Sequence, residues 1–139
     1  MATLKTNTLT GTSTAGSIAV TGEGNSTTTN LQQGLVKAWI NLGTSSATNR
    51  DSFNHSSITD NGTGDFSPVM TNAMANINYA QAAAMSRQTN ADTDSINTNN
   101  STGNDVDPTT TTYRFGALQF GTGGVDVKYV NFQIAGDLA

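Results

Sequence analysis

The chain contains a single histidine, His55. Among side chains, histidine has the ordinary pKa closest to neutral pH, so acid–base catalysis would depend on this residue. It stands between Asn54 and Ser56, in a stretch that is typical of a β-strand. The sequence contains no G-x-S-x-G nucleophile elbow that would present a serine for a Ser-His-Asp triad. We therefore expect His55 to act at a polar surface or between subunits, and we expect no enzyme activity and no cofactor.

Aspartates are the other candidates for chemistry, and four of them form two closely spaced pairs. The pairs are Asp92 with Asp94 and Asp105 with Asp107, inside a polar segment over residues 90–112. Calcium takes six to eight oxygen ligands, so oxygen-rich loops of this kind can bind it. No glutamate closes either run as in an EF-hand, and the only glutamate, Glu23, lies in a glycine-rich turn. Solvated loop carboxylates are the favoured interpretation, and the alternatives are a calcium site or an aspartate pair for glycoside hydrolysis.

The composition excludes several classes of partner. Charged residues make up 12% of the 139 residues, against about 25% in ordinary domains. The six lysines and arginines are scattered singly and the net charge is -4, so no basic patch is available for nucleic acid. The absence of cysteine excludes disulfides and thiolate zinc sites. Because neither a signal peptide nor a long apolar run is recognisable, we expect a protein made in a cytoplasm without membrane insertion.

The balance of apolar and small polar residues predicts a thin core. Apolar residues make up 35% of the chain, against about 45–50% in globular domains. A thin core is often completed by partner chains, because an obligate interface resembles a core cut in half. Threonine favours pleated surfaces while glycine and asparagine supply turns, so the composition is typical of a β-rich fold as well as of disorder.

The strongest strand pattern covers residues 33–42. Alternation places one apolar set on a single face of this strand, namely Val36, Ala38, Ile40 and Leu42. Trp39 falls on the opposite face. We expect Trp39 to anchor a core or an interface, and the alternative is a platform on which a sugar ring stacks.

A hairpin is predicted next, because strand patterns over residues 52–59 and 66–71 flank an Asp-Asn-Gly turn at residues 60–65. Pro68 indicates an edge strand or a bulge, since it has no backbone N–H to donate.

The second half of the chain is less clear. Residues 72–88 fit a helix by their alanine run and a strand by alternation, and both alternatives stay open. Residues 90–112 are expected to form a long loop. Residues 111–120 and 125–135 are predicted to be a hairpin-like pair of strands, with the last strand central in its sheet because it is the most apolar.

These elements predict an all-β protein, an antiparallel β-sandwich of jelly-roll-like type over residues 33–139. Residues 1–32 are expected to form an extended N-terminal arm with short strands at residues 4–9 and 17–21. Short strands cannot form a stable unit alone. We therefore expect the apolar side chains of the arm to serve assembly or packing together with Trp39; they are Leu4, Leu9, Ile18 and Val20.

Four motifs resemble a module of marine bacteriophage virion proteins, which are often labelled tail-fibre or structural proteins. The motifs are GLVKAW at residues 34–39, RDSFN at 50–54, SSITDNGTGDF at 56–66 and NINYA at 76–80. The opening TLKTNT at residues 3–8 is similar to a short leader ahead of that module. The likeness is close over residues 33–80, whereas the alanine run and the segment over residues 90–112 depart from the pattern.

The resemblance implies a strand over residues 78–83 and a non-enzymatic part of the virion. We expect a homo-oligomer, with a trimer favoured, that forms a tail-fibre-like appendage and contributes to host attachment. Its N-terminal arm would bind other virion proteins. A capsid decoration or cement protein is the alternative, and a carbohydrate-active enzyme is a third hypothesis.

If the protein contacts a host surface glycan or protein, we expect the long polar loop to make that contact, since loops carried on a rigid scaffold often do so. The expected contact residues are Asp92, Asp94, Asn99, Asn100, Asp105, Asp107 and Tyr113.

Overall fold

The computed structural model describes residues 3–13, 18–22, 28–86, 94–98, 106–119, 121 and 123–139. Its internal contacts divide the chain into two compact units, Met1–Leu35 and Val36–Ala139. This division falls close to the boundary predicted at residue 32. Each unit is described by itself.

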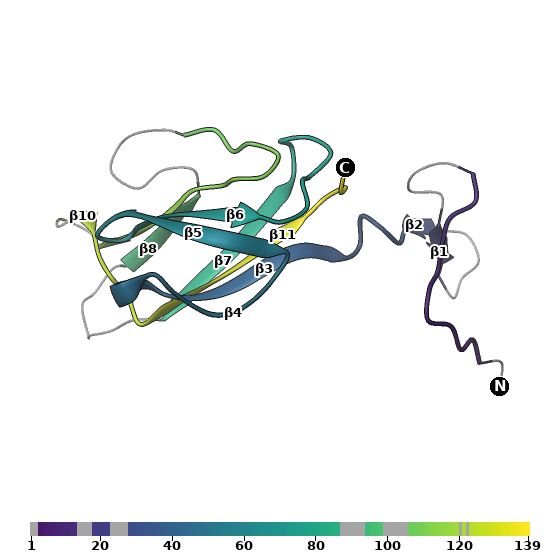
Figure 1. Ribbon diagram of the computed structural model, residues 1–139, viewed down its shortest axis with the longest axis horizontal. Helices are drawn as coiled ribbons and strands as arrows, with labels where there is room; N and C mark the ends of the chain where they lie inside the picture. The colour runs from purple at the N-terminus through teal and green to yellow at the C-terminus, as the bar shows by residue number, and fades with distance from the viewer. Residues whose placement is uncertain are drawn as a thin grey trace. The chain divides into compact units, whose positions relative to one another are not determined.

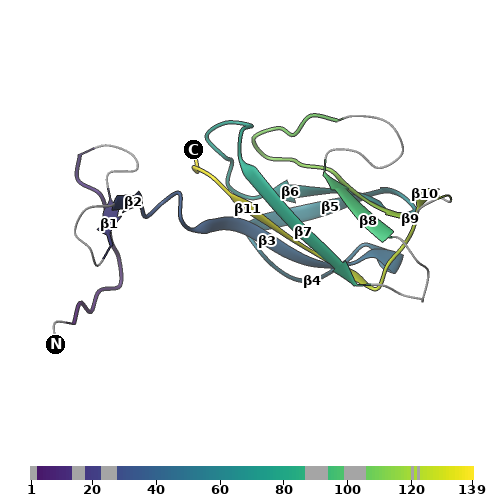
Figure 2. The same ribbon diagram turned by 180° about the vertical axis from the view of Figure 1, so that it is seen from behind.

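The second unit is a sandwich of two antiparallel sheets, which Figures 1 and 2 show as two layers. The first sheet has the order β4 (Thr48–Phe53), β3 (Val36–Gly43), β11 (Tyr129–Ala135) and β7 (Ala80–Ser86). The second has the order β10 (Gly123–Gly124), β9 (Phe115–Gln119), β6 (Asp65–Met70) and β5 (His55–Gly62), and β8 (Asp94–Thr98) also pairs with β9. The predicted all-β antiparallel sandwich is confirmed, whereas its jelly-roll-like detail stays a prediction.

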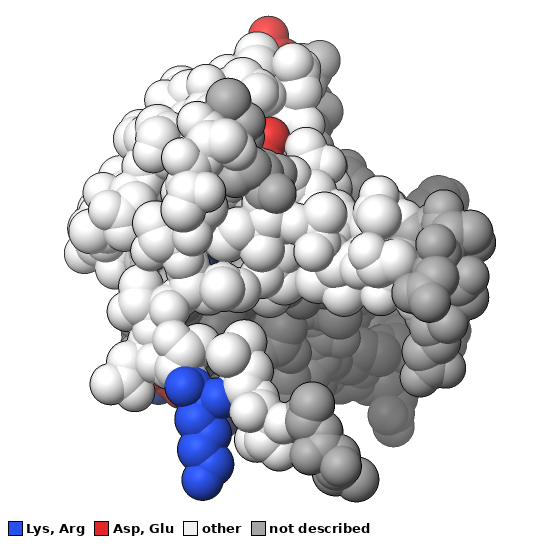
Figure 3. Space-filling model, turned by 90° about the vertical axis from the view of Figure 1, so that its right-hand side faces the viewer, with Lys and Arg blue, Asp and Glu red and all other residues white. Residues whose placement is uncertain are grey.

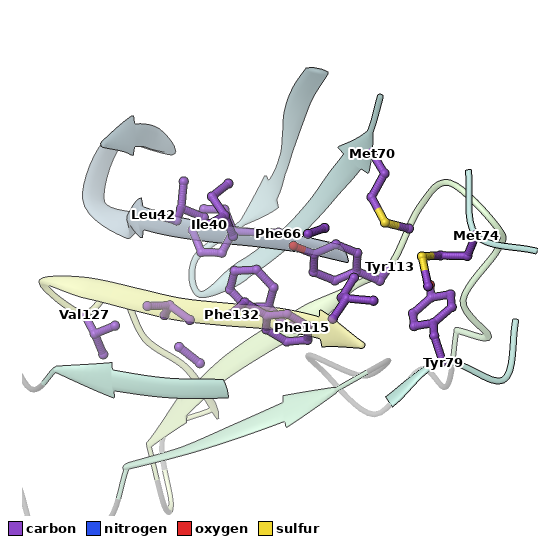
Figure 4. Packing of buried hydrophobic residues seen from close by; sticks show 14 residues of the cluster. Ile40, Leu42, Phe66, Met70, Met74, Tyr79, Tyr113, Phe115, Val127 and Phe132 are labelled. Carbon is purple, nitrogen blue, oxygen red and sulfur yellow. The ribbon is translucent and has the colours of Figure 1, made fainter. Parts of the chain in front are cut away.

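The core lies between the two sheets, and aromatic rings form its centre (Figure 4). Phe132 of β11 stacks on Tyr113 and Phe115, with ring centroids 4.6 Å and 5.4 Å apart. Stacked aromatic pairs contribute about 0.5–1.5 kcal/mol beyond the burial of their area. Around these rings, alternate residues of β3 and β11 point inward; they are Ala38, Ile40, Leu42, Val130 and Ile134. Val36 was predicted on the same face of β3 but is 41% exposed, where the pairing of β3 with β11 shifts register. Burial of each large apolar side chain stabilises the fold by roughly 1.5–3 kcal/mol.

The strand predicted over residues 52–59 is in fact two strands in different sheets. β4 ends at Phe53 and β5 begins at His55, because Asn54 adopts a left-handed conformation with φ 59°. The Asn54 amide stabilises this turn. Its Nδ2 donates to the carbonyl oxygens of Lys37 (3.1 Å) and Asn72 (3.2 Å), and its Oδ1 accepts from the backbone N–H of Asn72 (2.7 Å). Asn54 therefore carries the chain from one sheet to the other.

The predicted hairpin is confirmed as β5 and β6, which are joined at Gly62 and Asp65. Gly64 in its turn has φ 69°, and its N–H donates to Asp126 Oδ1 at 2.9 Å. A Cβ at Gly64 would lie 2.4 Å from the Ala117 carbonyl oxygen, so only glycine allows this close approach.

The prediction of an edge strand at Pro68 is wrong, since β6 lies between β5 and β9. Pairing with β9 stops at Phe66, so no β9 ladder bond depends on the missing N–H of Pro68.

Residues 80–86 form a strand, β7, which settles the choice between helix and strand there. All seven residues of β7 pair with β11, so tertiary pairing outweighs the helix propensity of the alanines. The predicted central position of the last strand is confirmed, because β11 lies between β3 and β7. The predicted pairing of that strand with residues 111–120 is wrong: β9 belongs to the other sheet. The expected long loop also contains a strand, β8.

The N-terminal unit contains one small antiparallel pair, β1 (Ala19–Thr21) with β2 (Thr28–Asn30). Residues 4–9 are described and form no strand, which corrects the first expectation for this unit. The second strand predicted there begins later, at Ala19. All described residues up to Leu35 are exposed or half-buried.

Candidate functional site

The outer face of the β4-β3-β11-β7 sheet carries an array of neutral side chains. Direct pairing places Phe53, Trp39, Gln133 and Ala82 in one row across the four strands. Directly paired residues point to the same face, about 4.5–5.5 Å apart at Cβ. The next row contains Asp51, Asn41, Asn131 and Ala84. We call Phe53, Trp39, Gln133, Asn131, Ala82 and Ala84 the aromatic–amide strip.

A shallow hollow of about 430 Å³ lies on this strip. Trp39 and the alanines of β7 supply its apolar lining, and Asn131 and Gln133 supply its polar lining. The Trp39 side chain is 37% exposed, and that of Phe53 is 54% exposed. Ligand sites in proteins are commonly hollows of about 300–1,000 Å³ with an apolar or aromatic lining and a few polar groups.

The amides of the strip can form hydrogen bonds in both directions. Asn41 Nδ2 donates to Asn131 Oδ1 at 2.7 Å, which orients the Asn131 side chain. The Nδ2 group of Asn131 then remains as a donor directed away from that bond, and Gln133 is exposed. The strip therefore presents donors and acceptors beside an aromatic ring.

Charged groups border the strip. Asp51 of β4 is exposed and pairs directly with Asn41. At one end of this face the Arg50 guanidinium lies 5.2 Å from the centroid of the Tyr129 ring, in a cation–π arrangement. At the other end burial lowers the pKa of Lys37, and the nearby Asp137 carboxylate opposes this shift. The residues that line the hollow between these ends are all uncharged. On the side of the molecule that Figure 3 shows, most described atoms belong to uncharged residues, with a few acidic and basic side chains among them.

His55 is engaged in the interior of the sandwich. Its Nδ1 lies 3.0 Å from the Phe53 carbonyl oxygen, and because a carbonyl only accepts, Nδ1 carries the proton. Its Nε2 then accepts a hydrogen bond from the Tyr113 hydroxyl at 2.7 Å. Burial lowers the pKa of His55, and its hydrogen bonds with backbone carbonyls partly offset this effect. The expectation of a polar surface role for His55 is therefore wrong in part, since its ring is half-buried against the core.

The Asp65 carboxylate is also engaged. Arg114 Nε donates to Asp65 Oδ1 at 2.7 Å, and Arg114 Nη2 donates to Asp65 Oδ2, so the pair is bidentate. This hydrogen bonding raises the pKa of Arg114. Within the described part of the chain, no group of three or more His, Asp or Glu side chains could hold a metal ion.

The predicted contact residues do not form a described site. Tyr113 is 1% exposed and belongs to the core, where burial raises the pKa of its hydroxyl, so its expected receptor contact is wrong. Asp107 is exposed, and Asp94 begins the strand β8, with its side chain outside the described set. Four further predicted residues lie outside the described residues; they are Asp92, Asn99, Asn100 and Asp105.

The residues predicted for assembly lie at exposed positions. Leu4, Leu9 and Val20 are 79%, 54% and 52% exposed, and Ile18 is half-buried. Trp39 does not pack in the core. The alternation of residues 33–42 already placed Trp39 opposite the buried face, but the amides beside it were missed. No local signal reveals that Asn131 and Gln133 are its neighbours, because only the pairing of β3 with β11 brings them together.

No helix among the described residues is long and apolar enough to cross a membrane. Comparisons with protein-family models, curated proteins and solved structures found no match to this chain.

Proposed function

We propose that this protein is a non-enzymatic structural subunit of a bacteriophage virion surface, in an oligomeric tail-fibre-like appendage that contributes to host attachment. One observation carries the proposal: no described residue of the N-terminal unit is fully buried, and several of its apolar side chains are exposed. Leu4 and Leu9 lie in an extended segment and are 79% and 54% exposed. Apolar surface of this kind is stable in water when a partner covers it.

The motifs that resemble the virion module support the same proposal. They fall on elements that determine the path of the chain through the fold. These are the strand β3, the turn between sheets at Asn54, the β5–β6 hairpin and the start of β7. The engagement of His55 with Tyr113 gives the only histidine a packing role, which favours a structural protein over an enzyme.

Localisation on the particle tests the proposal. Purified virions are analysed by mass spectrometry for this protein, and its position is mapped by cryo-electron microscopy of particles that carry a tagged copy. Density on the tail appendage, in a homo-oligomer with three copies favoured, is the expected result. A protein that is absent from the particle would contradict the proposal.

A capsid decoration or cement protein is the second candidate. The chain has 139 residues and its second unit is a single sandwich. A small sandwich with an arm suits attachment to a shell as well as to a fibre. Density on the head would favour this candidate over the appendage.

A further inference from the structure

We propose that the aromatic–amide strip binds a neutral oligosaccharide. This inference rests on the proposed function, because it names the ligand class through which the protein would contribute to host attachment. It places the contact on the outer face of the β4-β3-β11-β7 sheet and not on the segment over residues 90–112.

The strip combines an aromatic ring with side-chain amides, and a sugar can bind to both. The C–H bonds on one face of a sugar ring carry partial positive charge, and an aromatic face is electron-rich, so the two attract each other. Trp39 offers such a ring at 37% exposure. Sugar hydroxyls need donors and acceptors at the rim of the stack, and Asn131 and Gln133 provide both.

The charge of the lining residues favours a neutral ligand. All residues that line the hollow are uncharged. Charged side chains border it: Arg50 and Lys37 lie toward the ends of this face, and Asp51 is paired with Asn41 in the row beside Trp39. A neutral ligand loses no ionic solvation when it enters such a hollow, whereas an anionic one would meet no counter-charge there. The chemistry therefore selects neutral sugars over uronic acids or sulfated chains.

The elongated shape of the strip favours an extended ligand. The row from Phe53 through Trp39 and Gln133 to Ala82 crosses four strands, which spans about 14 Å at the usual strand spacing. The alanine side chains of β7 leave the strip open at one end, and Phe53 extends the aromatic surface at the other. An extended oligosaccharide chain fits a strip of this form better than a single compact sugar does.

A printed array of neutral and acidic oligosaccharides, followed by titration of the best neutral trisaccharide, tests the inference. Trp39 is the only tryptophan in the chain, so its fluorescence reports occupancy of the strip directly. We expect binding of a neutral oligosaccharide with a shift of the emission maximum. Trp39→Ala should abolish binding. Gln133→Ala should weaken it about five-fold, as expected for the loss of one hydrogen bond.

Two further variants separate binding from folding. Ala82→Ile fills the hollow while it keeps Trp39 and suits a strand, so it should weaken binding at least about ten-fold with an unchanged circular dichroism spectrum. Ile77→Ala is the matched control, because it removes another exposed apolar side chain (48% exposed) outside the strip. It should bind as the unaltered protein does.

Three results would overturn the inference: no neutral oligosaccharide on the array is bound, Trp39→Ala binds as well as the unaltered protein, or acidic sugars bind equally well. A fourth would reassign the strip. If Trp39→Ala dissociates an oligomer in analytical ultracentrifugation and binding is absent, the strip is an interface with a second copy of this chain. A protein that binds the trisaccharide but is absent from virions would contradict the proposed function and leave this inference standing.

Discussion

At the scale of single residues, His55 has a packing role that depends on one protonation state. Its Nε2 accepts a hydrogen bond from the Tyr113 hydroxyl, and its Nδ1 donates one to the Phe53 carbonyl oxygen. This arrangement requires the neutral imidazole. Burial is the main cause of its lowered pKa. The folded state therefore disfavours the protonated ring, while the unfolded chain accepts the proton near the ordinary pKa of 6.5.

This difference predicts how stability depends on pH. A group whose pKa is lower in the folded state contributes stability above its unfolded pKa, and that contribution is lost as pH falls through the folded pKa. The free energy of unfolding should therefore decrease as pH falls below 6.5. Urea unfolding between about pH 7.5 and pH 5 measures it.

The variant His55→Gln should show a weaker pH dependence over that range, because glutamine does not titrate. Tyr113→Phe is the control: it removes the hydroxyl partner but keeps the titrating ring, so it should be less stable at every pH and retain the slope. Equal slopes for His55→Gln and the unaltered protein would contradict the assignment.

Residue burial was predictable where strands alternate and unpredictable where a partner decides it. Alternation along β3 correctly predicts the burial of Ala38, Ile40 and Leu42, but not the exposure of Val36. Tyr113 was assigned to a contact loop, yet it stacks on Phe132, nineteen positions further along the chain. The burial of such a residue cannot be predicted from its polar neighbours in the sequence, because the ring that covers it belongs to the opposite sheet.

At the scale of elements, the transition from β4 to β5 depends on Asn54. The left-handed φ of 59° costs a typical residue about 1–2 kcal/mol, and the amide also makes hydrogen bonds with Lys37 and Asn72. Asn54→Ala should therefore lower the free energy of unfolding by about 2–4 kcal/mol. Asn54→Gly keeps the conformational freedom and should lose less. Chemical denaturation measures both variants, and equal losses would show that the backbone conformation contributes nothing.

Two glycines with positive φ offer a second comparison: Gly64 in the β5–β6 turn and Gly121 between β9 and β10. Gly64 (φ 69°) packs against backbone atoms of Ala117 and Val125, whereas Gly121 (φ 82°) has open space around its Cα. Gly121→Ala should cost only the conformational strain of about 1–2 kcal/mol. Gly64→Ala should cost clearly more, because its methyl group must also displace backbone. Similar unfolding midpoints for the two variants would contradict this account of the turn.

Local patterns predicted the strands of the two sheets better than their partners, although β8 was missed and β7 was left undecided. The β5–β6 hairpin has its turn residues in the sequence, so its pairing could be predicted. β9 and β11 looked like a hairpin because a glycine-rich turn lies between them. They belong to opposite sheets, since β11 pairs with β3, and that long-range pairing outweighs the short connection.

At the scale of the whole molecule, the two units differ in how they are stabilised. The core cluster consists entirely of residues from Val36–Ala139, whereas the described residues of the first unit are all exposed or half-buried. A protein that comprises residues 36–139 should keep the far-ultraviolet circular dichroism signal of a β-protein. Its thermal midpoint should lie within about 5 °C of that of the full chain, since the lost unit contributes no core.

The same truncation should prevent incorporation into the particle, because the arm carries the proposed contacts with other virion proteins. The full-length double variant Leu4→Ser, Leu9→Ser is the sharper test, as it keeps the chain length and removes only apolar surface. Both effects are read by mass spectrometry of purified virions. Normal incorporation of both variants would contradict the assembly role of the arm.

The sequence by itself determined the fold class, because alternation, turn residues and the low charge each act locally. It determined most of the inward face of β3 and the turn of one hairpin. Only the tertiary structure decided which strands pair beyond that hairpin, that Asn54 divides one predicted strand into two, and that the alternation over residues 80–86 prevails over their helix propensity. It also decided that Trp39 lies beside Asn131 and Gln133 while Tyr113 is buried. These features arise from contacts between residues far apart in the chain, and no local pattern of residue types encodes them.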